Sequence, residues 1–269
     1  MTTPPRSTAS ASAPTSSTSR TGHLPLSVWL ATAEHETPAL CRSGCCASVT
    51  ARLARELITA CTRLGDLVVD LYPADHVLTS SALRLGRHTL TVTTGLTPTQ
   101  TIGRSLALTH PAEDLRAAEL HITHEESTDR VLAHYRGRAA LVVLAHTAGP
   151  ARRLDDEPTE TSLLKAAELL RSGGHLGVVT GLHREDGHLY DPAPELIRQA
   201  QQVGLVYLQH IVALHATVRH GQITVPPLAR CTASRASGAG AVPVSVRVHS
   251  DVLLFTKPIT TACDVERAS

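Results

Sequence analysis

Apolar positions along residues 49–256 recur at two spacings, which predicts helices and strands in alternation. From Val49 to Thr62 they repeat every three or four positions, which is typical of an amphipathic helix. Leu67–Asp70 is a short apolar run that fits a buried strand, and Asp75–Leu85 predicts the next helix, closed by Gly86. Further strands are expected at His88–Thr94, Leu120–His124, Ala140–His146, His175–Thr180, Leu205–Leu214, Val242–Val248 and Val252–Thr256, and further helices at Thr97–Leu108, Thr161–Arg171 and Asp191–Val203.

The order of these segments predicts the class of fold. Strands that alternate with helices of about 10–15 residues indicate βαβ units and a mostly parallel sheet. No helix is expected between Val242–Val248 and Val252–Thr256, so these two strands should form an antiparallel pair. We therefore expect an α/β fold with a seven-stranded Rossmann-like sheet, mostly parallel with an antiparallel edge pair.

Composition narrows the classes of protein that this chain can be. Its 269 residues hold one Trp, one Phe and four Tyr, so the core must be aliphatic. The net charge of +1 argues against tight nucleic-acid binding, which usually needs a basic surface. Residues 1–26 are rich in Ser, Thr, Ala and Pro, which predicts a disordered tail before a domain at 27–258 and a C-terminal tail at 259–269. Without a membrane-length apolar run or a secretory signal, the expected location is cytoplasmic.

Cysteine and histidine spacing predicts no metal site. The six cysteines are scattered, at Cys41, Cys45, Cys46, Cys61, Cys231 and Cys263, and complete no zinc-binding pattern. His210 and His215 lie five residues apart on an expected strand and so point to opposite faces. His210 and His220 share a face, but ten strand residues separate them by about 33 Å.

The most informative candidate for ligand binding is the turn that follows the strand Leu67–Asp70. Open α/β sheets bind ligands at the carboxyl ends of their strands, where Asp70 is expected. Asp70 fits a ligand-binding carboxylate and, equally well, a cap of the following helix. A nucleotide-binding turn normally carries glycines because the backbone must approach the ligand closely. This turn has Tyr72, Pro73, Asp75 and His76 and no glycine.

Two further positions could take part in chemistry, and each has a simpler explanation. Glu125, with Glu126 beside it, follows the third expected strand and could meet the polar edge of a bound base, but loop carboxylates are usually solvated. His146 ends the strand Ala140–His146 and could act as a general base. No Ser, Cys or carboxylate nearby in sequence pairs with it, which favours a structural histidine.

Several segments resemble one known family in their order and spacing. They are Ser27-Val-Trp-Leu-Ala-Thr-Ala33, Gly65-Asp-Leu-Val-Val-Asp70, Leu85-Gly-Arg87, Leu141-Val-Val143, Gly149-Pro150, Leu170-Arg-Ser-Gly-Gly-His175 and Asp251-Val-Leu-Leu-Phe-Thr-Lys-Pro258. Over most of 27–258 the chain resembles actinobacterial DNA methylases of the N4-cytosine/N6-adenine type, which use S-adenosylmethionine. The resemblance implies a methyltransferase-like sheet, with S-adenosylmethionine as cofactor and DNA as a possible partner.

The chain departs from that family at the cofactor positions. Ala74 and His76 stand where the family has the glycines of its cofactor turn, and His76 places a side chain where the family brings its backbone near the methionine part of the cofactor. Thr93, or Thr94 beside it, stands where the family has an acidic partner for the ribose hydroxyls. Glu125 corresponds to the family's later acidic residue.

The catalytic motif also departs from the family. Ala145, His146, Thr147 and Ala148 replace its Ser-Pro-Pro-Tyr. In the family the first residue and a prolyl carbonyl hold the target amino group, and the Tyr stacks on the flipped base. Stacking contributes about 1–3 kcal/mol per base, and an alanine offers none.

The resulting hypothesis is a degenerate, catalytically inactive homologue that has a binding or regulatory role, with DNA or another protein as partner. Two alternatives stay open. One is a divergent but active amino-group methyltransferase acting on DNA, with Asp70 and Glu125 at the cofactor and His146 near the acceptor amine, working mainly by positioning. The other is an interaction module that binds no ligand.

Overall fold

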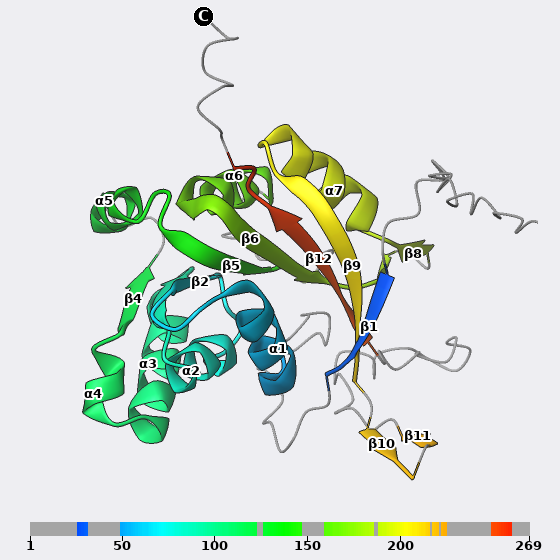
Figure 1. The fold of residues 1–269 in the computed structure, drawn as a ribbon. Helices are drawn as coiled ribbons and strands as arrows, with labels where there is room; N and C mark the ends of the chain where they lie inside the picture. The colour runs from blue at the N-terminus through cyan, green and yellow to red at the C-terminus, as the bar shows by residue number, and fades with distance from the viewer. Residues whose placement is uncertain are drawn as a thin grey trace, which may run out of the picture.

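One twisted sheet with helices on both faces forms the body of the protein (Figure 1). The structure, a computed structural model, describes residues 26–31, 49–122, 126–146, 159–185, 188–215, 217–220, 222–224 and 249–259. The sheet has eight strands in the order β1-β9-β12-β6-β5-β2-β3-β4. Their bounds are β1 Leu26–Leu30, β2 Leu67–Leu71, β3 His88–Thr93, β4 Ala118–Ile122, β5 Ala139–Ala145, β6 Leu170–Thr180, β9 Val206–Leu214 and β12 His249–Thr256.

The helices and two small hairpins complete the described elements. The helices are α1 Ala51–Cys61, α2 Val77–Arg84, α3 Leu96–Thr109, α4 Ala112–Leu115, α5 Glu126–His134, α6 Thr159–Leu169 and α7 Ala193–Gln202. One hairpin pairs β7 His183–Glu185 with β8 His188–Tyr190, and the other pairs β10 Thr217–Arg219 with β11 Gln222–Thr224. Within these ranges, no helix is both long enough and apolar enough to span a bilayer.

The predicted α/β class, with its mostly parallel sheet, is confirmed. Neighbouring strands from β4 to β6 run parallel, and β12 runs antiparallel to both β6 and β9 toward one side of the sheet. The expected partner strand at 242–248 lies outside the described residues, so β9 and β6 are the partners that the structure shows for β12. An eighth strand, β1, pairs with β9 in parallel.

The glycine pair Gly173-Gly174 lies inside a strand. The sequence predicted a helix up to Arg171, whereas α6 ends at Leu169 and β6 already begins at Leu170. Gly173 has φ +72°, and a Cβ on Gly174 would lie 2.8 Å from the carbonyl oxygen of Ala139 on β5. Close approach of two strands therefore requires glycine here, and the register of β5 on β6 shifts at the same place.

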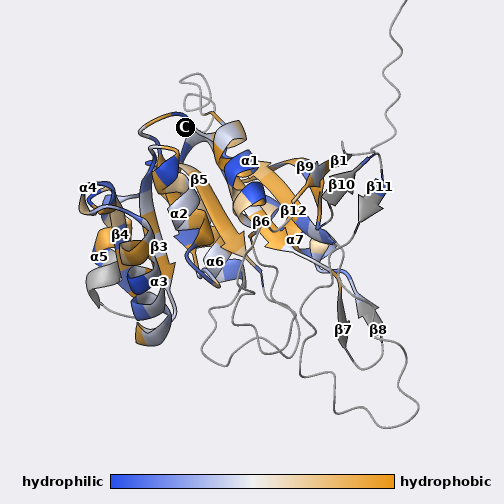
Figure 2. Ribbon diagram, turned by 90° about the horizontal axis from the view of Figure 1, so that it is seen from below, coloured by the Kyte–Doolittle hydropathy of each residue, from blue (hydrophilic) through white to orange (hydrophobic). Residues whose placement is uncertain are grey.

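The core consists of two aliphatic layers, one on each face of the sheet. Buried residues of α1 and α2 pack on one face, and those of α6 and α7 pack on the other. Figure 2 shows the central strands β5, β6 and β12 in the hydrophobic colour between these helices. Phe255, the single phenylalanine, is fully buried with its ring 5.3 Å from that of Tyr207. The predicted aliphatic core is confirmed within the described residues.

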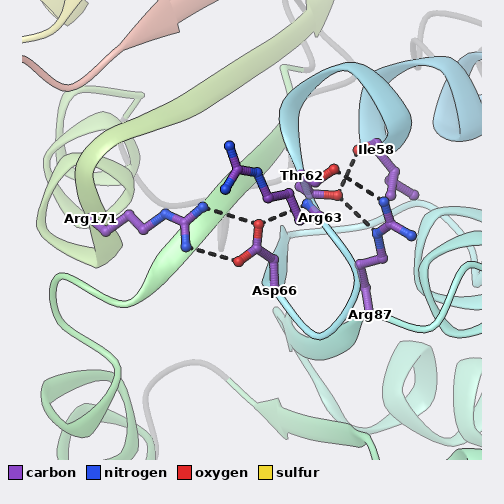
Figure 3. A network of polar contacts seen from close by, with 6 residues as sticks. All are labelled: Ile58, Thr62, Arg63, Asp66, Arg87 and Arg171. Atoms are coloured by element: carbon purple, nitrogen blue, oxygen red, sulfur yellow. Dashed lines mark hydrogen bonds and ion pairs between the residues drawn. The ribbon is translucent and has the colours of Figure 1, made fainter.

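A polar network joins the amino ends of β2 and β6 (Figure 3). The Asp66 carboxylate accepts two hydrogen bonds from the Arg171 guanidinium, at 2.8 and 3.0 Å, and a third from the Arg63 backbone N–H at 2.8 Å. Arg87 donates to the hydroxyl and carbonyl of Thr62, at 3.0 and 3.1 Å. These contacts tie the ends of the strands opposite to the candidate site and so help to fix their register.

Candidate functional site

The carboxyl ends of β2 and β5 meet over a small hollow. Asp70 of β2, Ala145 of β5 and residues of the turn between β2 and α2 line it. Among the described residues, the lining consists of Val49, Asp70, Pro73, Ala74, Asp75, Leu78 and Ala145. Asp70, Ala74 and Ala145, which the sequence placed at separate functional positions, are therefore brought together. The hollow has a volume of only about 10 Å³, which is room for about one water molecule.

The buried carboxyl of Asp70 lies beside two threonines. Its carboxyl is 5% exposed and accepts a hydrogen bond from the Thr79 hydroxyl of α2 at 3.3 Å. Thr79 in turn lies 2.8 Å from the hydroxyl of Thr91 on β3. Burial raises the pKa of Asp70 well above its usual range, the nearby Asp75 carboxylate raises it further, and the Thr79 hydrogen bond opposes both.

The turn from β2 to α2 is built around its side chains. Tyr72 adopts a left-handed backbone with φ 57°, unusual for a bulky residue, and its N–H donates to the Val92 carbonyl at 2.8 Å. The Asp75 carboxylate accepts from the Val77 N–H at 2.9 Å and so satisfies a free donor at the start of α2. Burial also raises the pKa of Asp75, against the lowering effects of that hydrogen bond and of His76.

His76 is the residue immediately before α2. Its carbonyl accepts from the Ser80 N–H at 2.8 Å, and its half-buried side chain makes no capping hydrogen bond. The imidazole does not line the hollow, whose turn side is formed by Pro73, Ala74 and Asp75.

Thr93, at the end of β3, lies apart from the hollow. Its buried hydroxyl lies 3.2 Å from the Gly95 carbonyl and 3.3 Å from the His121 carbonyl, which share its one proton, and it contacts the Thr99 hydroxyl at short range. With these partners the Thr93 hydroxyl secures the start of α3 against β4.

Only part of the expected acceptor position is described. Ala145 ends β5 beside Val179 of β6, and the backbone N–H of His146 donates to the Val179 carbonyl at 2.8 Å. The His146 side chain is half-buried and does not line the hollow. Glu125, Thr147 and Ala148 lie outside the described residues.

Histidines and carboxylates elsewhere make ordinary polar contacts. In the described ranges, no group of three His, Cys, Asp or Glu side chains is arranged to hold a metal ion. His210 bonds to Asp251 at 2.8 Å and His215 to Ser250 at 2.9 Å. Ser250 and Asp251 are neighbours on β12 and so point to opposite faces, as predicted for the two histidines. Of the cysteines, only Cys61 is described; burial raises its pKa to about 11.

Sequence reasoning missed the threonines and the second carboxylate of this site. Thr79 and Thr91 come from α2 and β3, and their meeting with Asp70 depends on the packing of the helix on the sheet. Asp75 carried a signal, because an Asp side chain in a turn commonly accepts a hydrogen bond from the backbone N–H two residues on.

Strand order and direction define an α/β fold with a Rossmann-like, mostly parallel sheet. No protein-family model matches the sequence, and no curated protein matches it. Solved structures with a similar fold include a TehB-like SAM-dependent methyltransferase from Corynebacterium glutamicum, 14% identical over 76% of this chain and 86% of that chain, with a TM-score of 0.43. A SAM-dependent methyltransferase from Methanosarcina mazei is 10% identical over 76% and 98% of the two chains, with a TM-score of 0.47.

A third similar structure contains a ligand. It is the 1,6-didemethyltoxoflavin-N1-methyltransferase of Burkholderia thailandensis with bound S-adenosylhomocysteine, 14% identical over 77% of this chain and 78% of that chain, with a TM-score of 0.45. At such low identity and similarity, these likenesses concern the general fold alone.

The residues at the hollow do not fit S-adenosylmethionine. Pockets that hold ligands of comparable size have volumes of about 300–1,000 Å³, whereas this hollow has about 10 Å³. The turn has no glycine at which the backbone could approach a ligand. Asp70 is buried beneath the turn, and the Thr93 hydroxyl is occupied within the protein.

Proposed function

We propose that this chain is a methyltransferase-like protein that has lost methyl transfer and serves as a binding or regulatory protein. The observation that carries the proposal is the filled hollow at the carboxyl ends of β2 and β5. Pro73, Ala74 and Asp75 line the hollow beside Asp70 and leave a volume of only about 10 Å³ there. A protein that cannot bind the methyl donor cannot transfer its methyl group.

The acceptor side of the hollow supports the same proposal. Ala145 stands at the end of β5, where an amino-group methyltransferase needs a side chain that accepts a hydrogen bond from the target amine. A methyl group offers no such acceptor. An alanine at this position supports the loss of the acceptor function, and the small volume of the hollow supports the loss of donor binding.

DNA is the first partner to test for the binding role. The resemblance of 27–258 to DNA methylases of the N4/N6 type supports an origin in that group, and degenerate homologues can keep a binding surface after catalysis is lost. The net charge of +1 predicts weak, strongly salt-dependent binding at most. Fluorescence anisotropy with labelled duplex DNA at low and at physiological salt measures this directly. If no DNA binding is found, a protein partner remains.

One observation favours a second candidate, a divergent but active methyltransferase. Asp70 and Ala145 share one hollow at the edge of the sheet where α/β enzymes bind ligands. For this candidate the turn would have to move away from Asp70 when the cofactor binds. The proposal of an inactive protein predicts that no such opening occurs.

Calorimetry with S-adenosylmethionine and S-adenosylhomocysteine separates the two candidates. We expect no binding heat from the full chain. An active methyltransferase of this fold, measured in parallel, serves as the positive control and should give binding heat. A matched variant replaces Pro73, Ala74 and His76 by glycine, so that the turn gains space and backbone freedom. Binding by this variant alone would support the role of the filled turn. Micromolar binding by the native chain, or transfer of a labelled methyl group to DNA, would refute the proposal.

A further inference from the structure

A second hollow, larger than the one beside Asp70, lies between the C-terminal halves of α5 and α6. Its volume is about 240 Å³, against about 10 Å³ beside Asp70. Pockets for drug-sized ligands have volumes of about 300–1,000 Å³, so this space suits a somewhat smaller molecule. We call it the α5–α6 groove; among the described residues its lining consists of Leu132, Ala133, Arg136, Lys165, Glu168 and Leu169.

The walls of the α5–α6 groove are fixed by backbone hydrogen bonds. The Gly137 N–H donates to the Glu168 carbonyl at 2.8 Å, and the Arg138 N–H donates to the Leu169 carbonyl at 3.0 Å. Gly137 has φ +67°, a left-handed backbone that favours glycine. The groove is therefore formed before any ligand binds. It lies at the amino ends of β5 and β6, opposite to the hollow beside Asp70, so binding here does not depend on the proposed loss of methyl transfer.

Apolar side chains form the floor of the groove, and charged side chains form its rim. Leu132 and Leu169 belong to the buried core, whereas Arg136 and Glu168 are exposed. The Arg136 Nε lies 3.2 Å from the Glu168 carboxylate. Lys165, half-buried on α6, adds a second cation to the lining. Two positive side chains and one negative side chain therefore line this space, which favours an anion.

One side of the Arg136 guanidinium is available to a ligand. A guanidinium has five N–H donors, and the contact with Glu168 is made through Nε. Within the described ranges, the terminal amino groups of Arg136 have no hydrogen-bond partner. Such a pair of amino groups matches the two oxygens of a carboxylate. The carbonyls at the end of α6 oppose an anion less than they otherwise would, because Lys257 Nζ donates to the Ala167 and Leu170 carbonyls at 2.8 and 2.9 Å.

We propose that the α5–α6 groove binds a small carboxylate with an apolar body, such as a medium-chain fatty acid. The carboxylate accepts two hydrogen bonds from the terminal amino groups of Arg136, Lys165 adds its positive charge, and the hydrocarbon lies over Leu132 and Leu169. Glu168 on the same rim repels a doubly charged anion, which favours a carboxylate over a phosphate monoester. Because the groove is small and partly open, the affinity is modest.

Calorimetric titration of the full chain with three matched probes tests this class of ligand. Octanoate supplies both the negative charge and the hydrocarbon, and acetate supplies the charge alone. Octylamine has the same hydrocarbon as octanoate with the opposite charge. We expect octanoate to bind with a Kd of about 0.1–1 mM, and acetate and octylamine to bind about tenfold more weakly or not at all.

Substitutions at the rim test whether the ligand binds in this groove. Arg136→Gln should weaken octanoate binding about tenfold, because the two hydrogen bonds to the carboxylate are lost. Arg136→Glu should bind octylamine better than octanoate, a reversal that a folding defect cannot produce. Ala133→Trp fills the groove from an exposed position on α5 and should abolish octanoate binding. Arg104→Gln removes the same charge from an exposed position on α3 and is the matched control, which should bind octanoate like the native chain.

Three outcomes would overturn the proposal. One is the absence of binding heat with octanoate up to about 5 mM. Another is equal binding of octanoate and octylamine, which would mean that the charged rim has no part in recognition. The third is octanoate binding that Arg136→Gln and Ala133→Trp leave unchanged, which would place the bound carboxylate elsewhere on the molecule.

Discussion

Replacing Asp70 by asparagine tests whether the site encloses its carboxyl as tightly as the structure indicates. The side chain is 5% exposed and, among the described residues, the Thr79 hydroxyl at 3.3 Å is its hydrogen-bond donor. Asparagine keeps the shape and the bond to Thr79 but cannot ionise. The variant therefore isolates the free-energy cost of burying a negative charge.

The sign and size of the effect follow from proton linkage. The unfolded chain loses the Asp70 proton near pH 3.9, whereas burial and the neighbouring Asp75 raise the pKa of the folded state well above that. Between these two pKa values the folded protein holds a proton that the unfolded chain has released. Its free energy of unfolding then falls by about 1.4 kcal/mol for each unit of rising pH. The stability is full below the unfolded pKa and is lost as pH rises through the folded pKa.

Urea unfolding of the native chain and the Asp70→Asn variant, from about pH 4.5 to about pH 7.5, measures this slope. We expect the difference in unfolding free energy to move in favour of the variant by up to about 1.4 kcal/mol per pH unit. Asp75 is present in both proteins, so its contribution to the unfolding free energy largely cancels in the difference. Parallel curves would refute the reasoning, because they would mean that the Asp70 carboxyl reaches water and ionises normally in the folded protein.

Three further predictions concern the body of the protein. Burial raises the pKa of Asp66, but bonds from the Arg63 N–H and the Arg171 guanidinium outweigh it and lower the pKa overall. Asp66→Asn should therefore lower the free energy of unfolding, measured with urea, by about 1 kcal/mol at neutral pH. This difference should vanish as pH falls through the lowered pKa. A difference that stays the same in acid would contradict the prediction. Phe255→Ala leaves a cavity beside Tyr207 and should lower the free energy of unfolding by about 3–5 kcal/mol, measured by the same method. A loss below about 1 kcal/mol would contradict the tight packing of Phe255. Cys61, with a pKa of about 11, should resist alkylation at about pH 8 in the folded protein and react in urea, as peptide mass mapping would show; rapid labelling of the folded state would disprove its burial.

Much of the fold could be predicted because each element carries a local signal. The apolar run Leu67–Asp70, the helical spacing from Val49 to Thr62 and the helix closed by Gly86 appear in the structure within a few residues of the expected bounds. The alternation of strands and helices was sufficient for the class, since parallel strands need such crossovers. The absence of glycine between Asp70 and α2 drew attention to the turn whose residues line the hollow.

Pairings between distant segments were beyond the reach of local patterns. β1 pairs with β9, although most of the chain separates the two strands in the sequence. The partner of Val28 and Trp29 is therefore present only in the folded sheet. Gly173 and Gly174 have the composition of a helix stop, yet the close approach to Ala139 of β5 makes them part of a strand. Tertiary contact outweighed the local preference here.

The sequence by itself determined the succession of elements, the aliphatic core and the side chains available at the turn, since these depend on residue type and spacing along the chain. Only the tertiary structure decided that Asp70, Ala74 and Ala145 share one small hollow, that Thr79 and Thr91 accompany the buried carboxyl, and that β1 pairs with β9 at one end of the sheet. The physical reason is that burial and free space belong to the packed assembly of elements. No single segment can indicate how much room its neighbours leave.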